Sequence, residues 1–140
     1  MTVRDVMTNQ VVRIAPEEPV QVAARMLEHY NIGVLPVCGR DGRLCGVVTD
    51  RDLVTRCLAG NRVPEKTMVR EVMTRAVVST QPNVNALTAA SLMSTHQIHR
   101  LPVLENGRLC GMVSLSDLAR REETAEEAGN ALADISSGVR

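Results

Sequence analysis

The sequence predicts an α+β fold made of two pseudo-symmetric β-α-β-β-α repeats packed sheet to sheet. The first observation is an internal repeat, because residues 3–8 return almost unchanged as residues 69–74. Residues 35–37 return in the same way as residues 101–103, again 66 positions later. The second observation is that each copy carries one amphipathic helical pattern followed by two short apolar runs around a turn. Two copies of this length indicate paired half-domains and not a solenoid of many short repeats.

The first half of each repeat predicts an extended segment followed by a helix. The short apolar pairs Val11-Val12 and Val77-Val78 indicate an edge strand or an extended segment, and a proline follows each pair. Asn83 is expected to cap the helix of the second copy. The residues expected on the buried helix faces are Ala23, Met26, Leu27 and Tyr30 in the first copy, and Leu87, Ala90 and Met93 in the second.

The second half of each repeat predicts a β-hairpin and a further helix. Asp41-Gly42 and Asn106-Gly107 each stand between apolar runs, which is a strong local signal for a hairpin turn. Pro36 and Pro102 cannot donate a ladder hydrogen bond, so each outgoing strand should be an edge strand or carry a bulge. The last helix should end near Gly60 in the first copy and continue past Leu118 in the second.

The repeat pattern predicts four regions along the chain. Residues 1–60 form the first repeat, residues 61–68 a polar linker, and residues 69–120 the second repeat. Residues 121–140 are charged and rich in alanine, which favours a solvated helical extension that frays at residues 136–138.

Composition excludes several classes of partner. The 16 basic and 16 acidic residues cancel, so no net field recruits nucleic acid or an anionic membrane. The single aromatic residue, Tyr30, leaves no stacking platform for single-stranded nucleic acid. Neither a membrane span nor a signal peptide is recognisable, so we expect a cytoplasmic protein with reduced thiols.

The cysteine spacing does not predict a metal site. The chain has four cysteines and three histidines, namely Cys38, Cys45, Cys57, Cys110, His29, His96 and His99. None of the cysteines forms a C-x-x-C pair, so neither a zinc ribbon nor a thioredoxin-type motif is present. Cys45 and Cys110 occupy matching places in apolar runs and are expected to be small buried hydrophobic residues. A zinc site that uses these side chains stays open as the minor alternative.

The candidate binding chemistry lies where each hairpin leads into the second helix. Thr49-x-x-Asp52 and Ser114-x-x-Asp117 place a hydroxyl and a carboxylate at this strand–helix junction. Exposed backbone N–H groups at a helix start attract phosphate, and the hydroxyl can donate to a phosphate oxygen. A carboxylate one turn later can accept hydrogen bonds from the two ribose hydroxyls. This combination suits a nucleotide.

The same spacing has a purely structural interpretation. Ser or Thr followed three residues later by an acidic residue is the pattern of a capping box, in which both side chains satisfy free backbone amides. A cap would repeat as readily as a binding site, so the repeat does not separate the two interpretations. Spacing alone favours the cap.

The two copies resemble a tandem pair of cystathionine β-synthase (CBS) domains, also called a Bateman module. The resemblance covers about residues 3–60 and 69–120, and its marks include residues 5–8, 32–37 and 46–52. Modules of this family bind AMP, ADP, ATP, S-adenosylmethionine or related adenosyl compounds in clefts between the repeats, and NAD is a further possibility. They also pair through their helices into disk-like homodimers.

The resemblance assigns roles to individual residues. Asp52 and Asp117 would hold the ribose, and Thr49 and Ser114 would face the phosphates. Residues 97–101 with 114–117 are similar to nucleotide-sensing repeats in the gamma subunit of AMP-activated protein kinase, which makes His99 and Arg100 candidate phosphate ligands. The equal alternative for these two residues is a solvated strand edge. Arg51 is a further phosphate candidate in the first copy, where the second copy has Ser116. The apolar candidates to surround adenine are Val12, Ile32, Val78 and Ile98.

The function expected on these grounds is regulatory. We expect a non-catalytic module that binds an adenosyl ligand, forms a homodimer and signals in trans to a protein partner that the sequence does not name. The alternative is a ligand-free interaction module that acts through homodimerisation alone. An enzyme is disfavoured because no cysteine, serine or lysine stands beside a credible base.

Overall fold

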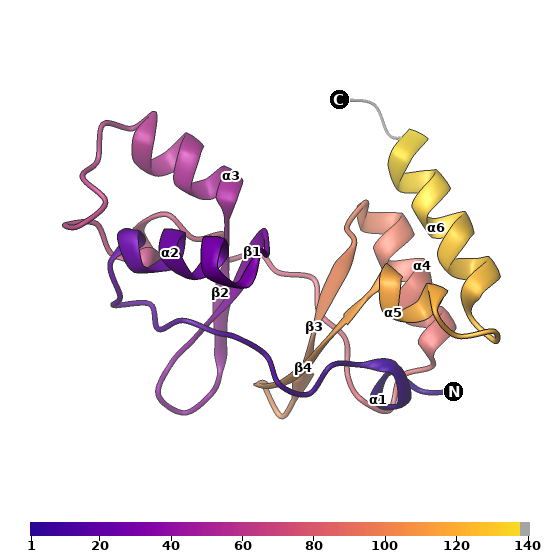
Figure 1. Cartoon of the computed structure of the whole chain (residues 1–140). Coiled ribbons are helices and arrows are strands. Elements are labelled where there is room, and N and C mark those ends of the chain that lie inside the picture. The colour runs from indigo at the N-terminus through magenta and orange to yellow at the C-terminus, as the bar shows by residue number, and fades with distance from the viewer. Residues whose placement is uncertain (138–140) are drawn as a thin grey trace. The chain divides into compact units, whose positions relative to one another are not determined.

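The computed structural model describes residues 1–137 and divides the chain into two compact units (Figure 1). The central unit is Val12–Val77, and the terminal unit combines Met1–Val11 with the chain from Val78 onward. Each unit contains helices and one small antiparallel sheet, which confirms the α+β fold class.

The compact units do not coincide with the sequence repeats. Residues 3–8, which open the first repeat, belong to the terminal unit, whereas residues 69–74, which open the second repeat, belong to the central unit. Helix α1 (Val3–Val6) and the 3-10 helix η2 (Val69–Glu71) occupy these segments. Each opening segment therefore packs with the hairpin of the other repeat.

The central unit is built on a β-hairpin, and one isolated β-bridge is added at each of its two edges. Its elements are α2 (Val20–Tyr30), β1 (Val34–Cys38), β2 (Leu44–Thr49), α3 (Asp50–Asp52), the π-helix η1 (Leu53–Leu58) and η2. Strands β1 and β2 pair antiparallel, with a bulge between Val37 and Cys38. Ile14 forms a parallel bridge to β1, and Thr74 forms an antiparallel bridge to β2.

The terminal unit repeats this plan and adds one helix. Its elements are α1, α4 (Ala86–His96), β3 (Arg100–Glu105), β4 (Arg108–Ser114), α5 (Leu115–Ala119) and α6 (Ala125–Ser137). Strands β3 and β4 pair antiparallel, with a bulge between Val103 and Leu104. Thr80 bridges to β3 in parallel, and Thr8 bridges antiparallel to Met112 of β4.

The expected edge strands are single bridges, and they lie a few residues later than predicted. Residues 11–13 and 75–79 are not in strands, and pairing occurs at Ile14 and Thr80. The prolines of β1 and β3 fit this arrangement because their carbonyl groups accept hydrogen bonds there. The Ile14 amide donates to the Pro36 carbonyl at 3.0 Å, and the Thr80 amide donates to the Pro102 carbonyl at 3.0 Å. The predicted bulges are present directly after each proline-containing stretch.

Both predicted hairpins form, but their turns differ. Asn106 and Gly107 have φ of 54° and 79°, which is the geometry of a two-residue type I′ turn. In the central unit the connection is longer, and the Asp41 carboxylate accepts a hydrogen bond from the Arg43 amide at 3.0 Å. Only Gly42 has a positive φ in that loop, at 82°.

Two details of the first helices differ from the prediction. Helix α4 is capped by Asn85 and not by Asn83, because the Asn85 side chain accepts from the Leu87 amide at 2.8 Å. The buried face of α4 consists of Ala86, Ala89, Ala90 and Met93, while Leu87 is 40% exposed. Tyr30 at the end of α2 is also exposed, so the core contains no aromatic ring.

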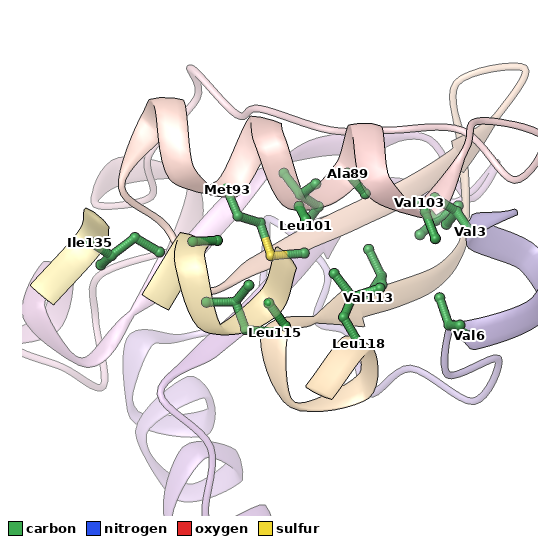
Figure 2. Close-up of a cluster of buried hydrophobic side chains, with 14 residues drawn as sticks. Val3, Val6, Ala89, Met93, Leu101, Val103, Val113, Leu115, Leu118 and Ile135 are labelled. Carbon is green, nitrogen blue, oxygen red and sulfur yellow. The ribbon is translucent and has the colours of Figure 1, made fainter. Parts of the chain in front are cut away.

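Each unit has its own aliphatic core. The core of the central unit includes Leu35, Val37 and Val48 from the hairpin together with Val69 and Val72 from the opening segment of the second repeat. The core of the terminal unit likewise combines strand, helix and α1 side chains (Figure 2). Gly46 and Gly111 allow the close approach of these opening segments. A Cβ atom at Gly46 would lie 2.5 Å from the Thr74 carbonyl oxygen.

The C-terminal helix is part of the terminal core. Ala128, Ala131 and Ile135 of α6 are buried, and Ser94 of α4 donates to the Asp134 carboxylate at 2.6 Å. The predicted helical extension is therefore present, but it is not solvated on all sides, because one face of α6 is apolar and packs on the core. Residues 136 and 137 lie within α6, and the predicted fraying at Gly138 falls outside the described residues. Within residues 1–137 no helix combines the length and apolar character needed to cross a membrane.

Candidate functional site

The first strand–helix junction forms a complete capping box. The Asp52 amide donates to the Thr49 hydroxyl at 3.0 Å, and the Asp52 carboxylate accepts from the Thr49 amide at 3.0 Å. These two bonds satisfy amides that the start of a helix leaves without partners. They fix the Asp52 side chain against the end of β2, where it is only 6% exposed.

Asp52 has two further partners that the sequence analysis did not identify. The Thr74 hydroxyl donates to its carboxylate at 3.1 Å and 3.3 Å, and the Arg56 Nε atom lies 3.7 Å from Asp52 Oδ1. Arg56 could have been found from its i,i+4 spacing, which places it on the same helix face. Thr74 could not, because its contact depends on the opening segment of the second repeat packing here.

The second junction repeats the capping box with different outer partners. The Ser114 hydroxyl accepts from the Asp117 amide at 3.1 Å, and the Asp117 carboxylate accepts from the Ser114 amide at 2.8 Å. The Arg120 guanidinium forms a close ion pair with Asp117. Asp117 is 9% exposed, so both junctions hold a nearly buried carboxylate.

The structure thus realises the capping interpretation at both junctions. Capping does not use all the hydrogen-bonding capacity of these side chains, because an ionised carboxylate offers two oxygens with about four lone-pair sites. The Thr49 and Ser114 hydroxyl protons are also free to donate, since these oxygens act as acceptors in the caps. A ligand could therefore use the same groups without breaking the caps.

His99 and Arg100 lie beside the second junction. Arg100 is directly opposite Ser114 in the β3–β4 register, and directly opposite side chains leave a sheet on the same face. The His99 carbonyl accepts from the Leu115 amide at 3.0 Å, which ties the start of β3 to the start of α5. Both side chains are exposed, and within residues 1–137 neither forms an ion pair.

The first junction has the same backbone with different side chains. The Asp50 amide donates to the Gly33 carbonyl at 3.1 Å, and Val34 lies opposite Thr49 in the β1–β2 register. Arg51 follows in α3 with an exposed side chain. The terminal unit therefore combines His99 and Arg100 with its hydroxyl and carboxylate, while the cationic candidate of the central unit is Arg51.

The apolar candidates divide between the two units in the same way. Val12 and Ile32 are partly buried against the central core, and Val78 and Ile98 are partly buried against the terminal core. Each of these side chains keeps some exposed surface next to a folded core. They are suited to contact a planar apolar group without unfolding the unit.

The four cysteine side chains lie in the cores or against them. Cys38 and Cys57 are buried, while Cys45 and Cys110 are partly buried against the cores, so the two residues expected to be buried are less so. Burial raises the pKa of the Cys38 thiol and of the Cys110 thiol, which keeps both protonated at neutral pH. Within residues 1–137 no three His, Cys, Asp or Glu side chains are grouped closely enough to hold a metal ion.

Comparison with known proteins identifies the family. The family model described as CBS domain matches residues 3–59 and 69–124. The chain is 42% identical over 135 residues to the CBS domain-containing protein YhcV of Bacillus subtilis, covering 96% of this chain and 95% of that protein. It is 34% identical over 119 residues to Hypoxic response protein 1 of Mycobacterium tuberculosis, covering 85% and 83%.

Solved structures agree with this assignment. The crystal structure of Hypoxic Response Protein I with two coordinated zinc ions matches with a TM-score of 0.79 at 34% identity, covering 86% of this chain and 98% of that one. A CBS domain pair crystallised with 5′-methylthioadenosine and S-adenosyl-L-methionine matches with a TM-score of 0.73 at 28% identity, covering 86% and 98%. The chain belongs to the CBS domain family and is built as a CBS domain pair.

Proposed function

We propose that this CBS domain pair is a non-catalytic regulatory module that binds an adenosyl ligand and passes the binding event to a partner in trans. The observation that carries the proposal is the cluster at the second junction. There Ser114, Asp117 and Arg100 belong to one strand–helix junction of one unit, with His99 next to them. Such a set of hydroxyl, carboxylate, guanidinium and imidazole groups matches the chemistry of a nucleotide.

Each group has a distinct role in this proposal. The ribose hydroxyls donate to Asp117 or Asp52, whose burial strengthens a hydrogen bond to the carboxylate. Arg100 and His99 contact phosphate, while Ser114 and Thr49 donate to it, and Arg51 is the corresponding cation of the central unit. Val12, Ile32, Val78 and Ile98 provide the apolar surface for adenine. AMP, ADP and ATP are the preferred ligands because they bring phosphate to the arginines, with S-adenosylmethionine and NAD as further candidates.

Chemistry and relatives support binding over catalysis. The two best-placed carboxylates are held in capping boxes, so neither is poised as a general base. The thiols whose pKa values are raised by burial are poor nucleophiles. A solved CBS domain pair was crystallised with two adenosyl compounds. We therefore assign no reaction to this chain.

The first test is thermal denaturation in the presence of AMP, ADP, ATP, NAD or S-adenosylmethionine. A ligand at about 100 times its Kd stabilises the folded state by about 2.7 kcal/mol. For a chain of this size that corresponds to a rise in Tm of several degrees. The proposal predicts a selective rise with at least one of these compounds, measured on protein freed of co-purified nucleotide. A flat panel would contradict it.

The second test asks whether Arg100 faces the phosphates. Arg100→Ala should weaken AMP, ADP or ATP binding by about tenfold or more, the size of a lost hydrogen bond to a charged group. Arg108→Ala is the matched control, because Arg108 is exposed at the hairpin end of the same sheet. 5′-Methylthioadenosine has neither a phosphate nor a carboxylate, so its affinity should be unaffected by Arg100→Ala. Equal effects of the two substitutions on AMP, ADP or ATP binding would remove Arg100 from the site.

A second candidate function is assembly through helices alone, and one observation favours it. Val54 and Leu58 on η1 are 56% and 61% exposed and lie four residues apart in the sequence. Large exposed apolar side chains in a group mark interaction surfaces. We propose that this surface pairs two copies of the chain into a homodimer, whether or not ligand is bound.

Sedimentation equilibrium tests this candidate. Val54→Glu with Leu58→Glu should convert a dimer into a monomer, because burying two carboxylates in an apolar interface is unfavourable. Glu substitution at Thr55, which lies between them in the sequence and is also exposed, is a control for added charge on this helix. A wild-type chain that sediments as a monomer would contradict the homodimer.

A further inference from the structure

A basic groove lies in the central unit beside η1 and the opening segment of the second repeat. It is an open groove with a volume of about 810 Å³, and four arginines and one acidic residue contribute to its lining. The arginines are Arg56, Arg62, Arg70 and Arg75, and the acidic residue is Glu71. The whole chain has 16 basic and 16 acidic residues, so this groove, here called the arginine groove, concentrates positive charge on a neutral protein.

Two of the four guanidinium groups are held in place by backbone carbonyl groups. Arg56 donates to the Met73 carbonyl at 3.0 Å and more weakly to that of Val72 at 3.4 Å. Arg75 donates to the Arg70 carbonyl at 3.3 Å. Carbonyl groups fix the position of a guanidinium without neutralising its charge. Each guanidinium has five N–H donors, so donors remain for a ligand.

Carboxylates neutralise only part of the charge. Arg62 forms an ion pair with Glu71 at 2.8 Å, and Glu71 also accepts from the Met68 amide at 2.7 Å. The Met68 amide, followed by Arg62, lowers the pKa of the Glu71 carboxyl, which is therefore ionised at neutral pH. Asp52 faces Arg56 at 3.7 Å. Four cations thus meet two carboxylates. Within residues 1–137 Arg70 and Arg75 form no ion pair, although the charge of Arg70 also acts on Glu71.

We propose that the arginine groove binds an oligophosphate, meaning two or more linked phosphoryl groups. Guanidinium groups match phosphate oxygens in paired hydrogen bonds, and several arginines placed around one groove can contact successive phosphoryl groups. The volume of this open groove lies within the range of small-ligand sites, about 300–1,000 Å³. This inference does not rest on the adenosyl proposal, because an oligophosphate needs no nucleoside to bind here.

Calorimetric titration with inorganic pyrophosphate and tripolyphosphate tests the groove directly. The titrations use the full chain at constant ionic strength, without added divalent cations. The groove variant is Arg70→Ala with Arg75→Ala, since both side chains are exposed and their loss leaves the core intact. The matched control is Arg40→Ala with Arg43→Ala, which removes the same charge from the hairpin loop of the same unit.

The proposal predicts that wild type and control bind pyrophosphate and that the groove variant binds it at least about tenfold more weakly. Tripolyphosphate should bind more tightly than pyrophosphate, and orthophosphate more weakly than either. Equal pyrophosphate affinity in the groove variant and the control would overturn the proposal. It would also be overturned if wild type bound orthophosphate as tightly as pyrophosphate, or if only a single-stranded oligonucleotide bound the groove.

Two further ligands separate this site from the adenosyl site and identify the source of the phosphates. 5′-Methylthioadenosine has no phosphate, so its titration reports on the adenosyl proposal alone. Pyrophosphate binding without binding of methylthioadenosine, AMP or S-adenosylmethionine would support the groove and contradict the adenosyl proposal. Binding of these adenosyl compounds without pyrophosphate binding would overturn the groove alone. If the groove substitutions weaken ATP and pyrophosphate equally, the tail of a nucleotide is one source of the oligophosphate. If they weaken pyrophosphate alone, the source is a free oligophosphate.

Discussion

The central and terminal units share a backbone plan but surround the same carboxylate differently. In the central unit Asp52 is met by the Thr74 hydroxyl and, at 3.7 Å, by Arg56, and an apolar Val34 lies opposite Thr49. In the terminal unit Asp117 is met by Arg120, and Arg100 lies opposite Ser114. The capping boxes, which the fold needs, are common to both units. The charged groups around them differ.

The largest difference in stability should come from substituting the glycines that contact the opening segments, Gly46 in the central unit and Gly111 in the terminal unit. In Gly46→Ala the new Cβ would lie 2.5 Å from the Thr74 carbonyl oxygen, and this backbone atom cannot move without breaking the Val47–Thr74 bridge. We expect a loss of about 3 kcal/mol in the free energy of unfolding, at the upper end of overpacking effects. Urea denaturation measures it.

Gly111→Ala is the comparison in the other unit. Its Cβ would first meet the sulfur of Met7 at 2.7 Å, and a flexible side chain can move aside, although the Thr8 carbonyl oxygen follows at 2.9 Å. The loss should therefore be smaller than for Gly46→Ala. A larger loss for Gly111→Ala would show that the Thr74 contact is less rigid than we describe.

The next largest effect on stability should come from helix α6, which only the terminal unit has. Ile135→Ala should lower the free energy of unfolding by about 2 kcal/mol, since Ile135 is 9% exposed in the terminal core. Leu132→Ala is the control on the same helix, where the side chain is 46% exposed and the change should stay within about 0.5 kcal/mol. Equal effects in urea denaturation would mean that α6 does not pack as described.

The hydrogen-bond partner of the Asp52 carboxylate should contribute a smaller difference in the free energy of unfolding than the core side chain of α6. Thr74→Val removes a hydroxyl that donates to the nearly buried Asp52, so unfolding should cost about 1 kcal/mol less. Thr8→Val changes the equivalent residue of the first repeat, whose side chain is exposed, and should be close to neutral. Matching urea midpoints for the two variants would contradict a special role for Thr74.

The smallest effect should come from one carboxyl group in each opening segment, Asp5 and Glu71. Both should make the Tm depend on pH in the same direction. The Thr2 amide and hydroxyl lower the pKa of Asp5 below 3.8, and the Met68 amide and then Arg62 lower that of Glu71 below 4.5. A carboxyl whose folded pKa is depressed adds stability above its unfolded pKa and loses it as pH falls through the folded value. The Tm should therefore fall on acidification below about pH 4.5. Asp5→Asn with Glu71→Gln should make this fall shallower, and an unchanged slope would contradict the assignment.

Local signals predicted the parts of the structure that depend on neighbouring residues. The turn dipeptides, the bulges near Pro36 and Pro102 and the two capping boxes all follow from chemistry within a few positions. The helix faces were predicted less well, because Tyr30 and Leu87 lie at the edges of their apolar stripes and are exposed.

Long-range packing could not be predicted in the same way. Residues 3–8 and 69–74 are so similar that the sequence does not indicate which hairpin each will meet. Residues 69–74 of the second repeat pack in the central unit, where Thr74 contacts Asp52 and the segment lines one side of the arginine groove. The sequence analysis did not predict the burial of α6. Ala128 and Ala131 are small residues in a charged segment, so the apolar face is not evident from the sequence.

Calorimetric titration with the tightest-binding compound of the adenosyl panel shows whether the Asp52 and Asp117 carboxylates hold the ribose. It compares the wild type with Asp52→Asn and Asp117→Asn, since asparagine keeps a carbonyl oxygen for the cap but removes the charge and one acceptor oxygen. The proposal predicts that at least one substitution weakens binding by about tenfold or more in a variant that still unfolds in a single cooperative transition without ligand. If both variants bind as tightly as the wild type, the two carboxylates are caps only and do not hold the ribose.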